Sequence, residues 1–570
     1  MPTLTATWTR RGSALRAPSL WFVRLGRSPA WPFVVLRIAL VVALPIFVAL
    51  YHDLNRHYLW QPDFELSIVY NALVLGSGLP NYHPGQVGFG HFYLLTGWFK
   101  LLKGLGVIDV ASLTDLAAPP AVEAQLQVLM FWARTLSLVF IALLVVVVMR
   151  IGQELSGSRA YGFLAALAFA GTQSLNTHVV HIRTDTSAVL LAYLAILMFL
   201  LAVKRDREWG RSLELLVAGA FFSVAAFYAR TSIFPLLLVI PLIPLVFAPS
   251  ARSEPPGRVP PAVALAVFAG AIIAASLILP SIVARMGIFA KFYYSVLVAY
   301  GIACLLIYRY RRDMRLGSVL AAGGALILGA AAAAYLFTIQ DHLINTDTVA
   351  NPVDFLATLG GQGLTPALTL LQMAQRFVVG LSAIFTEGVF NFCWVCRRVS
   401  IIYLLAFVLL VTVWIRVDRE LRVRATVLIL AFAFVEATLR LYVFNNFYRV
   451  YAEGLLFATT VFYAVAVLHR TRPRWRRRVA VAAVIFTAWF AVDDVSRKML
   501  WPSFAAHIGD VCTQRLNTPG IGHFFDRYCG PDSTFKGREP WFYESRPSFL
   551  GRLEPWVVPP NYRHRVVPLD

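Results

Sequence analysis

The sequence LWQPDFELSIVYNALVLGSGLPNYHPGQVGFGHFYLL occupies residues 60–95, shortly after the first apolar run of membrane length at 33–51. It contains two acids, Asp63 and Glu65, then an apolar run and a break rich in Gly, Pro and Asn that includes His83. A carboxylate this close to hydrocarbon is costly unless it is paired or takes part in chemistry. The stretch therefore predicts a membrane protein with a functional loop after its first span.

The composition is typical of a polytopic membrane protein. Of the 570 residues, 58% are hydrophobic and only 14% are charged, which is too apolar for an ordinary soluble protein. The net charge of +21 falls mainly in short loops between apolar runs, where the positive-inside rule expects basic residues. Membrane lipids are therefore the expected partners of this charge, and nucleic acid is not.

One orientation makes the loops on the inner side basic, and it starts from an Arg-rich cytoplasmic segment at 1–32. It predicts an all-α polytopic membrane protein with about thirteen transmembrane helices. A bacterial inner membrane is expected, and in an endoplasmic-reticulum membrane the same external loops would face the lumen. The transmembrane domain is expected over 33–495, with external loops at 52–127 and 339–398 and an external tail or cap at 496–570.

Two helix-like runs in the first external loop, 64–75 and 87–104, are expected to lie in the outer interface and not to span. The second carries Lys100 and Lys103 and is interrupted by Gly. The expected spans are 33–51, 130–149, 160–178, 186–203, 213–229, 233–248, 262–282, 289–308, 318–338, 400–415, 425–443, 452–468 and 479–495.

The five cysteines divide by their expected side of the membrane. Cys304 lies in an expected span, where it would pack inertly. Cys393 with Cys396, and Cys512 with Cys529, lie in external segments, where an oxidising compartment suits disulfides. Free thiols, and a redox or metal role, stay open as alternatives.

Four short motifs follow one another on the expected outer side. They are Asp63 with Glu65; Tyr82-His83-Pro84-Gly85; His181-Ile182-Arg183-Thr184-Asp185 before the fourth span; and Arg449 with Tyr448 and Tyr451 before the twelfth. In this order the chain resembles the GT-C integral membrane glycosyltransferases, in particular the lipid A aminoarabinose transferase and protein O-mannosyltransferase-like superfamily. It departs from them where Gly85-Gln86 replaces the family's Pro-Leu, and in the tail 496–570, which has no assigned counterpart.

The resemblance implies a polyprenyl-phosphate sugar donor and an acceptor that is a glycan, a lipid or a protein. Because the leaving group is a phosphate, cations must hold its developing charge. The candidates are Arg183, Arg230 and Arg449, all at external span ends, although Arg230 and Arg449 could instead only anchor their spans. His83 and Tyr448 are further candidates for binding substrate.

The acceptor hydroxyl or amine needs a general base, and a carboxylate within hydrogen-bond reach would serve. Asp63 is the expected base, with Glu65 or Asp185 as a second acid. Direct displacement would invert the anomeric centre. The resemblance leaves open whether a metal cofactor takes part, and two acids with a histidine could hold a divalent cation.

Each site residue also has a structural interpretation. Asp63 could be a helix N-cap, and Glu65 could be a solvated surface acid. Asp185 could form a structural ion pair with Arg183, and His83 could cap or pack within its loop. The competing functions are a transporter or flippase of lipid-linked sugar and a non-catalytic membrane scaffold, which should tolerate Asp63→Asn.

Overall fold

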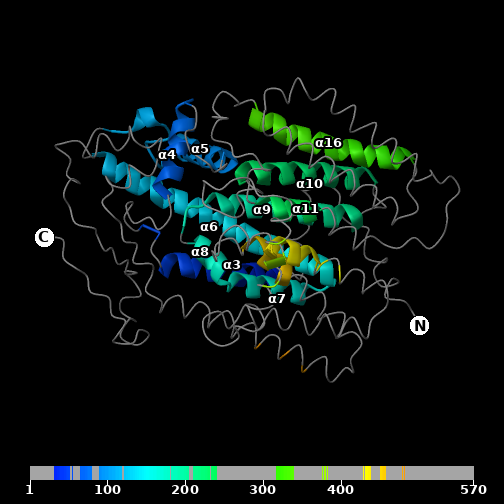
Figure 1. Ribbon diagram of the computed structural model, residues 1–570. Coiled ribbons are helices and arrows are strands. Elements are labelled where there is room, and N and C mark those ends of the chain that lie inside the picture. Colours follow the sequence, from blue (N-terminus) through cyan, green and yellow to red (C-terminus); the bar gives the residue numbers. More distant parts are fainter. Residues whose placement is uncertain are drawn as a thin grey trace, which may run out of the picture.

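The computed structural model is drawn in Figure 1, and its described part contains helices and no strands. The described residues are 31–51, 54–55, 65–79, 89–117, 121–179, 181–204, 209–230, 233–240, 316–338, 430–437 and 450–457, with isolated positions between 375 and 485. The helices are α3 Trp31–Tyr51, α4 Glu65–Gly76, α5 Phe89–Gly104, η1 Leu113–Asp115, α6 Ala121–Ser156, α7 Arg159–Ala170, α8 Gln173–Val179, α9 Thr184–Lys204, α10 Trp209–Ala229, α11 Phe234–Val239 and α16 Leu316–Thr338.

Four of the described helices are long and apolar enough to cross a membrane. They are Pro32–Leu50 in α3, Ala124–Ser156 in α6, Thr184–Lys204 in α9 and Gly210–Ala229 in α10. The all-α membrane class expected from composition is thereby confirmed, and the chain is an integral membrane protein. The expected number of about thirteen spans stays a prediction, because many of those runs lie outside the described residues.

The helices α16, α10, α9 and α6 lie side by side in that order, and α3 and α7 pack against α6 on its other side (Figure 1). Glycines allow these helices to cross closely. Such glycines are common in membranes, where association of apolar helices depends on close packing and not on the hydrophobic effect. A Cβ at Gly329 of α16 would lie 2.0 Å from the Val217 carbonyl oxygen of α10. A Cβ at Gly162 of α7 would lie 2.5 Å from the Met149 carbonyl oxygen of α6.

The pair α4 and α5 packs at one end of this layer, against α6, α9 and α10 (Figure 1). Thr96 of α5 donates to the Ala72 carbonyl of α4 at 2.7 Å, and the Trp98 indole donates to the Trp132 carbonyl of α6 at 3.1 Å. Both runs expected to be helical in the first loop are helices here. Their position relative to the membrane interface stays a prediction.

The run 160–178, expected to form one span, is not one continuous helix, because α7 ends at Ala170 and α8 begins at Gln173. Thr172 lies between them and serves both helices. Its hydroxyl donates to the Phe169 carbonyl at 2.9 Å and accepts from the Leu175 amide at 3.4 Å, which is N-cap geometry for α8. A hydropathy profile does not reveal such a cap, so the sequence predicts one continuous helix over this run.

The second expected span, 130–149, belongs to a longer helix, since α6 covers Ala121–Ser156. The additional residues are 121–129 at one end and 150–156 at the other. Within the first of these additions, the Gln127 side-chain amide donates to the Asn55 carbonyl at 2.6 Å.

Candidate active site

The turn between α8 and α9 places the charged side chains of the site. Thr186 closes this turn with two bonds to the Arg183 carbonyl, from its hydroxyl at 2.7 Å and from its amide at 3.3 Å. On the preceding side, His181 Nδ1 lies 2.6 Å from the Thr177 carbonyl oxygen. Asp185 consequently sits in the first turn of α9, where the helix dipole stabilises a negative charge.

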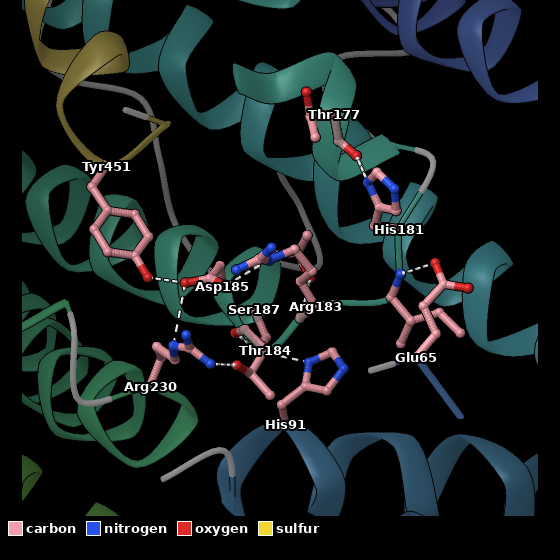
Figure 2. A network of polar contacts seen from close by, with 12 residues as sticks. Glu65, His91, Thr177, His181, Arg183, Thr184, Asp185, Ser187, Arg230 and Tyr451 are labelled. Atoms are coloured by element: carbon pink, nitrogen blue, oxygen red, sulfur yellow. Dashed lines mark hydrogen bonds and ion pairs between the residues drawn. The ribbon is translucent and has the colours of Figure 1, made fainter. Parts of the chain in front are cut away.

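Asp185 is the centre of a buried charged cluster, with 0% of the residue exposed (Figure 2). Arg183 Nε lies 3.0 Å from one of its carboxylate oxygens, and Arg230 Nε lies 3.4 Å from the other. The Tyr451 hydroxyl donates to the same oxygen that Arg230 faces. Two guanidinium groups therefore converge on one carboxylate, and guanidinium groups suit the binding of anionic oxygens.

Arg230 is held at a second point, because its Nη1 donates to the Thr184 hydroxyl at 2.9 Å. Its own amide donates to the Ala226 carbonyl at 3.0 Å, so it continues the last turn of α10. A cation is favoured at that end of a helix. The start of α9 and the end of α10 therefore meet at this cluster.

Tyr451 reaches the cluster because its helical segment, 450–457, is bound to α9. The Tyr193 hydroxyl donates to the Tyr451 carbonyl at 3.0 Å and accepts from the Leu455 amide at 2.9 Å. A Cβ at Gly454 would lie 2.6 Å from the Tyr193 ring, so only glycine allows this approach. A late segment of the chain thus supplies a hydrogen-bond donor to Asp185.

Glu65 lies beside the cluster in an ion pair with Arg134 of α6. Arg134 Nη2 is 2.9 Å from Glu65 Oε2, and both side chains are 0% exposed. The other oxygen, Oε1, accepts from the Ile182 amide at 3.0 Å (Figure 2). Glu65 is therefore not the solvated surface acid considered as an alternative, since an acid buried in this way requires its partners.

His91, near the start of α5, lies next to the cluster, beside Ser187 of α9. Its Nδ1 lies 2.9 Å from the Ser187 hydroxyl oxygen, and its ring packs edge-on to Phe140 at 6.2 Å between centroids. Burial lowers the pKa of His91 to about 4; nearby Asp185 acts in the opposite sense, and Arg230 lowers it further. The imidazole is therefore neutral at physiological pH.

The structure unites part of the predicted site. Arg183, Arg230 and Asp185 are in one cluster, and Glu65 is joined to it through Ile182. Four predicted site residues lie outside the described part of the chain: Asp63, His83, Tyr448 and Arg449. All five cysteines also lie outside it: Cys304, Cys393, Cys396, Cys512 and Cys529. Within the described part, no group of three or more His, Cys, Asp or Glu side chains is placed to hold a metal ion.

Arg134 and His91 were missed by the sequence analysis. Arg134 lies inside an expected span and His91 inside an expected interfacial helix. An ionisable residue within an apolar run is by itself a functional signal, and this signal was available for both. The sequence could not identify the residues that contact these two side chains.

No protein-family model and no curated protein matches the chain. Among solved structures, it is similar to the apo oligosaccharyltransferase of Archaeoglobus fulgidus, with a TM-score of 0.43 and 12% identity over 91% of this chain and 62% of that one. It is also similar to ArnT from Cupriavidus metallidurans bound to undecaprenyl phosphate, with a TM-score of 0.25 and 13% identity over 78% of this chain and 82% of that one. The chain thus spans less than two thirds of the oligosaccharyltransferase.

Both TM-scores lie below 0.5, so these two similarities by themselves assign no role to the chain.

Proposed function

We propose that the chain is a glycosyltransferase that moves a sugar from a polyprenyl-phosphate carrier to a glycan, lipid or protein acceptor on the external side of the membrane. The observation that carries this proposal is the meeting of Arg183 and Arg230 at Asp185. The cluster lies at the ends of apolar, span-length helices, where a lipid-borne phosphate would arrive. Fixed cations in a water-poor site stabilise a leaving phosphate as its charge develops.

Asp185 has a supporting role in this proposal. Its two oxygens each face one guanidinium group, and Tyr451 adds a hydrogen bond. These contacts hold Arg183 and Arg230 in place before substrate binds, so that little reorganisation is needed during the reaction. Arg449 is proposed as a further phosphate ligand.

Asp63 is proposed as the general base, and the position of Glu65 supports this choice. Asp63 precedes Glu65 by two residues in the chain. Glu65 in turn is bound to the amide of Ile182, next to Arg183. The proposal for Asp63 rests on this sequence neighbourhood and on the motif that it shares with Glu65.

The proposed reaction is a single displacement at the anomeric carbon. The acceptor hydroxyl or amine attacks that carbon and gives its proton to Asp63. The bond from the anomeric carbon to the phosphate oxygen breaks, and polyprenyl phosphate leaves with the electron pair toward the arginines. The configuration is inverted. The proposed location is a bacterial inner membrane, with the N-terminus in the cytoplasm and the C-terminus on the external side.

The test is to reconstitute the protein in lipid with a panel of polyprenyl-phosphate hexoses and pentoses, and to follow released polyprenyl phosphate by mass spectrometry. Wild type should consume one donor, and Asp63→Asn should abolish release. Asp109→Asn removes an exposed acid in the same external segment and should leave release unchanged.

Two outcomes would contradict the proposal. Movement of intact donor across the bilayer without release of polyprenyl phosphate would identify a transporter. Wild-type behaviour of Asp63→Asn in every assay, with no donor consumed by either protein, would identify a scaffold.

A further inference from the structure

The two nitrogens of His91 have different surroundings. The residue is 1% exposed, and Nδ1 lies 2.9 Å from the Ser187 hydroxyl oxygen. Nε2 is buried and has no hydrogen-bond partner among the residues that the structure describes. A buried polar atom without a partner is costly, so this nitrogen needs a functional explanation.

The Ser187 contact determines which nitrogen carries the proton. The single hydroxyl proton of Ser187 is donated to the Thr184 carbonyl oxygen at 3.1 Å. The Ser187 oxygen can therefore only accept from His91, so Nδ1 must carry the proton for both hydrogen bonds to exist together. In a neutral imidazole Nε2 is then a bare acceptor with a free lone pair.

The backbone holds this acceptor next to the arginine cluster. A Cβ at Gly90 would lie 2.8 Å from the Ala229 nitrogen, so the first turn of α5 touches the last turn of α10 directly before Arg230. Figure 2 shows His91 beside Ser187 and Thr184, on the side of the cluster where Arg230 bonds Thr184. A sugar is bonded directly to the donor phosphate, so a phosphate at Arg230 would bring the sugar ring to this side.

We propose that His91 binds the transferred sugar, with Nε2 accepting a hydrogen bond from one of its ring hydroxyl groups. This inference rests on the proposed function and adds a contact that selects the sugar. A site with a buried acceptor of this kind discriminates strongly against an analogue that lacks the hydroxyl, because the acceptor is then left unpaired. No proton is transferred, and His91 acts as a specificity-determining residue.

Two substitutions separate the two nitrogens. In His91→Asn the side-chain amide can still donate to Ser187, but the acceptor at the Nε2 position is lost. In His91→Gln the side-chain carbonyl can replace the Nε2 acceptor, but the Ser187 bond is lost. We expect kcat/KM for the accepted donor to fall about tenfold to a hundredfold in His91→Asn, and by much less in His91→Gln.

A donor series provides the second measurement. Wild type should have a lower kcat/KM for one monodeoxy donor than for the complete sugar donor. His91→Asn should not show this difference, because the variant already lacks the hydrogen bond to the missing hydroxyl group. The opposite ranking, with His91→Asn active and His91→Gln impaired, would show that the ring only supports Ser187. Equal loss in both variants, or unchanged deoxy discrimination in His91→Asn, would also overturn the proposal.

Binding distinguishes this inference from the proposed function. Polyprenyl-phosphate sugar should raise Tm more than polyprenyl phosphate alone does. This surplus in Tm measures the sugar contact, and it requires no transfer. If that surplus is present in wild type and lost in His91→Asn while no acceptor is ever glycosylated, the transfer proposal fails and the sugar site stands. If transfer occurs and the surplus persists in His91→Asn, the sugar site fails and the transfer proposal stands.

Discussion

Glu65 and Arg134 form an ion pair that is closed to solvent, with 2.9 Å between Oε2 and Nη2 and neither side chain exposed. Glu65 opens α4 and Arg134 belongs to α6. The remaining Glu65 oxygen accepts from the Ile182 amide. One carboxylate therefore joins two helices to the turn that carries Arg183.

Replacing Glu65 by Gln should destabilise the protein strongly. The amide oxygen can still accept from Ile182, but the charge of Arg134 remains buried without its counterion, which typically costs about 3–5 kcal/mol. Thermal unfolding in detergent, followed by tryptophan fluorescence, measures the change. The double variant Glu65→Gln with Arg134→Gln should recover part of the loss, because no uncompensated charge is left.

The matched control is the solvent-exposed pair of Lys103 and Asp115, whose side chains are 42% and 21% exposed. Lys103→Met should cost less than about 1 kcal/mol, since surface ion pairs contribute little. Equal destabilisation by Glu65→Gln and Lys103→Met would refute the assignment of a structural role to the buried pair.

Replacing Tyr451 by Phe should lower transfer without unfolding the protein. The ring keeps its packing, while Asp185 loses one donated hydrogen bond and holds the two arginines less firmly. A hydrogen bond to a charged group contributes about 1.5–3 kcal/mol, so we expect a fall in kcat of about tenfold or more. Tyr335→Phe on α16 removes a hydroxyl from a residue that is 66% exposed and should have no effect on the rate. Full activity of Tyr451→Phe would exclude this supporting role.

Two glycines of α5 should respond in opposite ways to substitution by Ala. At Gly90 a Cβ meets the Ala229 nitrogen at 2.8 Å, so α5 must move away from α10 and carry His91 with it. At Gly97 a Cβ meets nothing within 4 Å, and Ala favours the helix by up to about 1 kcal/mol. Gly90→Ala should lower both Tm and transfer, and Gly97→Ala should preserve or raise Tm. The same response at both positions would count against tight contact at Gly90.

The buried His91 should make stability depend on pH. Its pKa is about 4 in the folded protein, chiefly because burial disfavours the imidazolium, and about 6.5 in the unfolded chain. Between these values the unfolded state binds a proton that the folded state does not, so stability falls as pH falls from about 6.5 toward 4. From pH 7 to pH 5, Tm should drop further for wild type than for His91→Gln. Parallel drops would show that His91 is not buried as a neutral ring.

Several elements were predictable because they depend on local properties. The apolar run 33–51 became α3, and the runs 64–75 and 87–104 became α4 and α5. Length and apolarity are sufficient for such assignments, because a backbone in hydrocarbon has few alternatives to a helix. The break at Thr172 was not predictable in the same way, since a cap acts through one hydroxyl within an otherwise apolar run.

By itself, the sequence determined the class of this protein: a helical membrane protein with charged groups near the ends of its spans, among them Arg183, Asp185 and Arg230. Hydropathy and charge are properties of single residues and short runs, so they can be read without the fold. Only the tertiary structure decided that Glu65 pairs with Arg134, that Tyr451 bonds Asp185, and that Nε2 of His91 is buried without a partner among the described residues. Each of these features depends on segments that are far apart in the chain. Close approaches of Gly90 to Ala229 and of Gly454 to Tyr193 bring the segments that carry His91 and Tyr451 against α10 and α9.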